Sequence, residues 1–77
     1  MENLSNMNYD DIIAFYYTVD RTNKVLILQY LARQIMSELD RKSNLQNIQE
    51  IRDYVRILPT LQVRQRQIDQ MANELRN

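Results

Sequence analysis

The side chains that most often carry acid-base and nucleophilic chemistry are missing from this sequence, which has no histidine and no cysteine. Asp10 and Asp11 are adjacent carboxylates, but neighbours on a helix diverge by about 100° and do not converge on one substrate atom. No acidic cluster has calcium-loop spacing, and there is no glycine for the turn of such a loop. We therefore expect a non-enzymatic protein without catalytic residues, metal or cofactor.

Arginine is the charged residue type that stands out, since eight of the ten basic residues are Arg. Arginine forms forked hydrogen bonds with carboxylate or phosphate groups. A cluster with few acids nearby comprises Arg52, Arg56, Arg64 and Arg66. With Gln46 and Gln49, this cluster indicates a helix that could read a DNA groove. A DNA-associated transcriptional regulator using the Arg and Gln face of residues 46–66 is therefore one hypothesis. The zero net charge and the flanking acids make nucleic acid the less favoured partner.

The absence of glycine and the single proline, Pro59, leave helices as the main elements. A first helix is predicted to begin near Asn8, which has capping-box spacing to Asp11. Its apolar side chains recur to about Val19, and residues 1–7 are expected to be disordered. The alternative is a β-hairpin, because residues 12–19 and 25–31 are rich in β-branched and aromatic side chains.

A second helix is predicted from about Asn23 to Arg41, with the apolar stripe Val25, Leu28, Ala32, Ile35 and Leu39. A cap at Ser43, Asn44 or Asn47 then starts a third helix, whose stripe is Ile48, Ile51, Val55 and Leu58. Pro59 is expected to end or kink this helix. The residues after it form another stripe on a different face, which predicts a fourth segment from about Thr60 with Leu61, Ile68, Met71, Ala72 and Leu75.

Together these patterns predict an all-α single domain over residues 1–77. We expect a small three- to four-helix bundle, built on a helical hairpin of the first two helices with a Pro-kinked C-terminal helix packed on it. The longest apolar run, residues 12–17, is far shorter than the roughly 20 residues that span a bilayer. We therefore expect a cytoplasmic protein with no membrane segment.

The first helix is apolar over an arc of about 200°, twice the width that one core-facing stripe requires. The segment from Val25 to Leu31 is also apolar in nearly every direction. This surplus predicts a second chain, with homodimerisation favoured. Tyrosine suits such interfaces because it brings a large area with a polar tip. The predicted anchors are Tyr9, Tyr16, Tyr17 and Tyr30.

Arg64 falls within the last apolar stripe, between Leu61 and Ile68. A charge at such a position can fix register or partner choice, but its aliphatic stem can also simply pack against the stripe. The preferred functional hypothesis is a protein-protein interaction module that acts as a small regulator, adaptor or stoichiometric inhibitor. Its size is compatible with an origin in a virus or mobile element. Selectivity would come from the tyrosines and from Arg52, Arg56, Arg64 and Arg66.

Overall fold

The computed structural model describes residues 4–76, and this range contains helices and no strand. The α-helices are α1 (Tyr9–Tyr16), α2 (Arg21–Asp40) and α3 (Ile48–Arg76). A 3₁₀ helix, η1 (Leu4–Asn6), precedes α1, and a second one, η2 (Arg41–Asn44), follows α2. The predicted all-α class is confirmed. The alternative β-hairpin of residues 12–19 and 25–31 is wrong.

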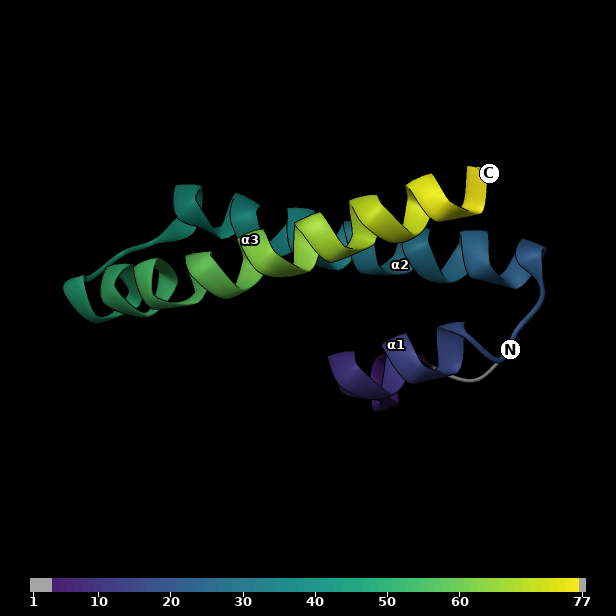
Figure 1. The fold of residues 1–77 in the computed structure, drawn as a ribbon. Coiled ribbons are helices and arrows are strands. Elements are labelled where there is room, and N and C mark those ends of the chain that lie inside the picture. The colour runs from purple at the N-terminus through teal and green to yellow at the C-terminus, as the bar shows by residue number, and fades with distance from the viewer. Residues whose placement is uncertain (1–3, 77) are drawn as a thin grey trace.

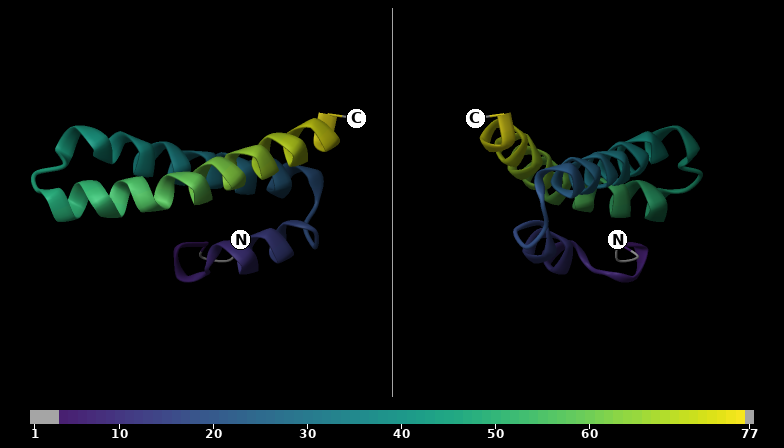
Figure 2. Two further views of the ribbon diagram at one scale, coloured as in Figure 1. Left: turned by 60° about the vertical axis from the view of Figure 1, so that its left-hand side comes forward. Right: turned by 90° about the vertical axis from the view of Figure 1, so that its right-hand side faces the viewer.

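The hairpin of this fold is formed by α2 and α3, which run antiparallel and side by side (Figure 1). The expected hairpin of the first two helices is therefore incorrect. The physical reason is length: α1 has eight residues and α2 has 20, which correspond to about 12 Å and 30 Å of helix. Only α2 and α3 can form a long shared seam. The short α1 packs against one face of the pair (Figure 2).

The beginnings of α1 and α2 are fixed by side-chain caps. The Oδ1 atom of Asn8 accepts a hydrogen bond from the backbone N–H of Asp11 at 2.8 Å, as the sequence predicts. Asp20 does the same for the N–H of Asn23 at 3.0 Å, so α2 begins two residues before its predicted start. Each cap satisfies a backbone donor that the helix leaves without a partner.

The end of α1 comes three residues before the predicted Val19. The hydroxyl of Thr18 donates to the carbonyl of Phe15 at 2.7 Å, and the backbone N–H of Thr18 donates to the same oxygen at 2.9 Å. This local bonding satisfies the last turn of α1 and diverts the chain toward α2.

The beginning of α3 is set by Asn47, one of the three predicted caps. Its Oδ1 atom accepts from the N–H of Glu50 at 2.9 Å. The carboxylate of Glu50 accepts in turn from the N–H of Gln46 at 2.8 Å. This exchange resembles a capping box, except that the carboxylate of Glu50 binds the N–H of Gln46, which precedes the cap, and not the N–H of Asn47 itself. Ser43 instead donates to the carbonyl of Asp40 and closes η2.

Pro59 lies inside α3, and the helix continues through it to Arg76. The predicted fourth segment from Thr60 is therefore part of α3. One stripe of core-facing residues passes the proline with regular spacings of three and four: Tyr54, Ile57, Leu61, Arg64, Ile68, Met71 and Leu75. Pro59 cannot donate to the carbonyl of Val55, but both residues are exposed, so water can reach that carbonyl. Packing on α2 therefore outweighs the lost hydrogen bond.

The core lies where α1, α2 and α3 meet, around the fully buried Ile27. Residues 1–7 were expected to be disordered, but Leu4 is buried in this core and Met7 packs against it. Residues 1–3 lie outside the described residues. The other buried members of the core are Ile12, Tyr16, Leu28, Leu31, Ile35, Leu61, Ile68 and Met71.

Candidate interaction surface

The α2–α3 pair has two broad faces, and α1 packs on one of them (Figure 2). On the opposite side, two apolar hollows lie between α2 and α3, and no residue of α1 lines either one. We call this side the open face. It comprises Val25, Gln29, Ala32, Met36 and Leu39 of α2 and Gln65, Asp69, Ala72 and Leu75 of α3.

The open face continues toward the beginning of α3. Leu58 and Ile51 precede Gln65 by one and two heptads, so they lie on the same side of the helix. The predicted buried stripe of the third helix is largely exposed: Ile48, Ile51 and Val55 have exposed fractions of 67%, 47% and 57%. That part of the sequence prediction is incorrect. The stripe that begins at Tyr54 and Ile57 faces α2 in its place.

The hollows of the open face are small, at about 130 and 280 Å³. Small-molecule sites usually enclose about 300–1,000 Å³. The open face is therefore shaped for contact with side chains of another polypeptide rather than for enclosing a ligand. Met36, with an exposed fraction of 62%, is its most exposed large apolar side chain.

The predicted tyrosine anchors are placed in different environments. Tyr16 has an exposed fraction of only 3% and belongs to the core, whereas Tyr17 is exposed and makes an edge-to-face contact with the Tyr16 ring. Tyr9 and Tyr30 are half-buried and pack against the core. Burial raises the pKa of both Tyr9 and Tyr16 above the ordinary value of 10.0. Whether these tyrosines contact a partner stays a prediction.

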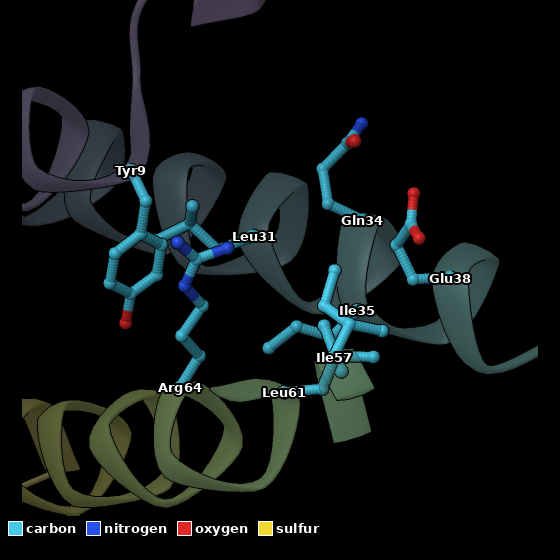
Figure 3. A pocket seen from close by; sticks show the side chains of 8 residues that line it. All are labelled: Tyr9, Leu31, Gln34, Ile35, Glu38, Ile57, Leu61 and Arg64. Carbon is cyan, nitrogen blue, oxygen red and sulfur yellow. The ribbon is translucent and has the colours of Figure 1, made fainter. Parts of the chain in front are cut away.

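The fold brings together three of the predicted site residues, Arg64, Tyr9 and Tyr30, which line one hollow. The guanidinium carbon of Arg64 lies 4.3 Å from the centroid of the Tyr9 ring, and the Tyr9 hydroxyl donates to Oε1 of Gln67. Tyr9 and Arg64 also line a hollow with Leu31 and Leu61, and the aliphatic stem of Arg64 can pack against these two leucines. Figure 3 shows that the ends of Gln34 and Glu38 extend away from the Arg64–Tyr9 pair. Arg64 therefore joins α3 to α1 within the chain.

The other predicted arginines, Arg52, Arg56 and Arg66, are exposed. By helical spacing they lie on the outer side of α3, away from α2. The structure therefore separates them from Arg64, which the sequence placed in the same cluster.

The sequence reasoning missed the open face itself. The signal that could have revealed it is the apolar stripe through Tyr54, Ile57 and Leu61. If this stripe faces α2, then Ile51, Val55 and Leu58 must lie on another side of the helix. On α2, the exposed Met36 lay outside the predicted stripe.

No helix within residues 4–76 combines the length and apolar character needed to cross a membrane. The same range holds no group of three or more acidic side chains that could bind a metal ion. Comparisons of the chain with protein-family models, with curated proteins and with solved structures found no match.

Proposed function

We propose that this chain is a protein-protein interaction module that binds another polypeptide through the open face. In this role it acts stoichiometrically, as a small regulator, adaptor or inhibitor, by covering a surface of its partner. The observation that carries the proposal is the apolar side of the α2–α3 pair that α1 leaves uncovered.

Burial of this face is energetically favourable because apolar surface removed from water contributes roughly 25 cal/mol per Å². Large apolar patches rimmed by polar groups are typical of interaction sites on folded proteins. Here Met36 and Val25 are exposed in the middle of the open face, and Gln29, Gln65 and Asp69 supply polar groups beside them. This arrangement matches the apolar centre and polar surroundings of protein interfaces.

The test compares a charge placed on the open face with the same charge placed elsewhere. Met36→Asp disrupts the open face, whereas Val63→Asp is the matched control, because Val63 is equally exposed at 63% and lies on the α1 side of α3, away from the open face. Both variants are checked for helix content by circular dichroism. Each tagged chain is then used to capture proteins from the native cells, and captured proteins are reconstituted with the purified chain.

The proposal expects a reconstituted complex that forms with the wild type and with Val63→Asp, and that is lost with Met36→Asp. Self-association with the same dependence on Met36 also supports it. Binding that is equal for the wild type and Met36→Asp would contradict it.

A second candidate function is binding of duplex DNA, favoured by the three exposed arginines on the outer side of α3. Arg52, Arg56 and Arg66 are available to phosphates. Binding of a random duplex should then fall steeply with salt and should be lost when Arg52 and Arg56 are both changed to Ala. Met36→Asp should leave DNA binding unchanged, which separates the two functions.

A further inference from the structure

The identity of the polypeptide on the open face can be inferred from where its charges lie. Ala32 of α2 lines the same hollow as Ile68 and Asp69 of α3, so these residues lie at one level of the hairpin. Arg33 follows Ala32 directly, so it shares the level of Asp69. Asp69 belongs to the open face on α3, and Arg33 lies beside that face on α2.

Helical spacing places Arg33 at the edge of the open face. It lies four residues after Gln29 and three before Met36, both of which line the hollows, and residues at these spacings share one side of a helix. Arg33 and Asp69 are both exposed. Within residues 4–76 the structure has a single salt bridge, between Glu38 and Arg41, so neither Arg33 nor Asp69 is ion-paired with another residue of that range.

We propose that the open face binds a second copy of this chain, in a dimer whose twofold axis runs parallel to α2 and α3 between the two open faces. This inference rests on the proposed function and names the partner. The axis places α2 of one copy against α3 of the other. Every neighbouring pair in the resulting four-helix bundle is then antiparallel, as in common four-helix bundles.

The twofold axis pairs opposite charges at the level of Arg33 and Asp69, whereas at the end of the face it brings together the exposed Arg21 and Arg76, which line one hollow. Because the axis runs along the helices, it keeps each residue at its own level while exchanging the two sides of the face. Arg33 of each copy therefore faces Asp69 of the other, and the dimer contains this ion pair twice. A surface that complements itself in this way is the requirement for an isologous interface.

The size of the face is adequate for such a dimer. The 20 residues of α2 extend about 30 Å, and two packed helices are roughly 18–20 Å wide. The projected area is roughly 500–600 Å², and the accessible area of a corrugated surface is larger than its projection. This approaches the ~800 Å² per partner of a standard interface. A second copy also stabilises a chain that is too short for a large core and has no disulfide.

The test is a charge exchange followed by sedimentation over a wide range of protein concentrations. The wild type is expected to form a dimer. Arg33→Asp and Asp69→Arg each place like charges opposite each other twice, so each weakens dimerisation by about tenfold. The double variant, Arg33→Asp with Asp69→Arg, restores both pairs and regains most of the affinity. Because both residues are exposed, these variants keep the fold of the monomer.

The control is Arg52→Asp, which makes the same charge change on the outer side of α3 and leaves dimerisation unchanged. A wild type that stays monomeric, or a double variant no better than either single one, overturns the inference. If the chain is a monomer that still captures another protein through Met36, the inference that the partner is a second copy is wrong, but the proposed function stands. A dimer that is indifferent to Met36→Asp overturns both.

Discussion

The guanidinium of Arg64 stacks on the ring of Tyr9 and thereby connects the middle of α3 to the first residue of α1. This contact explains how a charge can occupy a core-facing heptad position without an acidic partner. The ring face offers partial negative charge to the cation, and Arg64 lines one hollow with Leu31 and Leu61, against which its aliphatic stem can pack. The pair therefore holds the short α1 against the hairpin.

The contribution of this contact can be measured with a double-mutant cycle. Arg64→Met keeps the apolar stem and removes the charge, and Tyr9→Leu removes the ring. We expect a coupling free energy of about 0.5–1 kcal/mol in urea unfolding. Tyr9→Phe is the control, because it keeps the ring and loses only the hydrogen bond to Gln67. If the two substitutions have additive effects, the stacking contributes no stability.

Pro59→Ala is expected to stabilise the protein by about 1–2 kcal/mol. Alanine supplies the missing N–H to the carbonyl of Val55 and favours the helix interior, although the unfolded chain regains some entropy. The measurement is urea unfolding followed by helix signal. Thr60→Ala, at the exposed neighbouring position, should gain only a few tenths of a kcal/mol. An unchanged stability for Pro59→Ala would mean that α3 is interrupted there.

Tyr54→Phe is expected to cost about 1 kcal/mol. The hydroxyl of Tyr54 donates to the carbonyl of Leu39 at 2.9 Å and connects the beginning of α3 to the last turn of α2. Its removal leaves that carbonyl without this donor in a part-buried place. Tyr17→Phe, at an exposed position, serves as the control and should change stability by less than about 0.5 kcal/mol. Equal effects of the two substitutions would show that the Tyr54 bond is not stabilising.

Stability should decrease as the pH rises above about 10. Burial raises the pKa of Tyr9 and Tyr16 above the ordinary value of 10.0, so the unfolded chain releases these protons at lower pH than the folded chain does. Below that pH both states hold the protons, and above it the unfolded state gains by ionisation. Thermal unfolding across this range measures the effect. The variant with Tyr9→Phe and Tyr16→Phe should show a shallower decline, and an identical decline would contradict this origin.

The sequence by itself determined the mainly helical class and the beginning of α1, and it limited the beginning of α3 to three capping residues. Without glycine the chain lacks the usual residues of tight hairpin turns. Asn8 and Asn47 carry side chains that act on backbone N–H groups only three residues away. Such interactions are local, so the residue types and their spacing suffice to predict them.

The tertiary structure decided which helices pair and which apolar stripe is buried. Ile48, Ile51 and Val55 form as regular a stripe as Tyr54, Ile57 and Leu61, and periodicity alone does not rank the two. The second stripe is buried because it continues in register to Ile68 and Met71 along the full length of α2, whereas the first extends only to Leu58 and is followed by Gln62 and Gln65. The free energy gained by burial is a sum over the whole contact surface. It therefore outweighed the tendency of Pro59 to break the helix and left the shorter stripe in solvent.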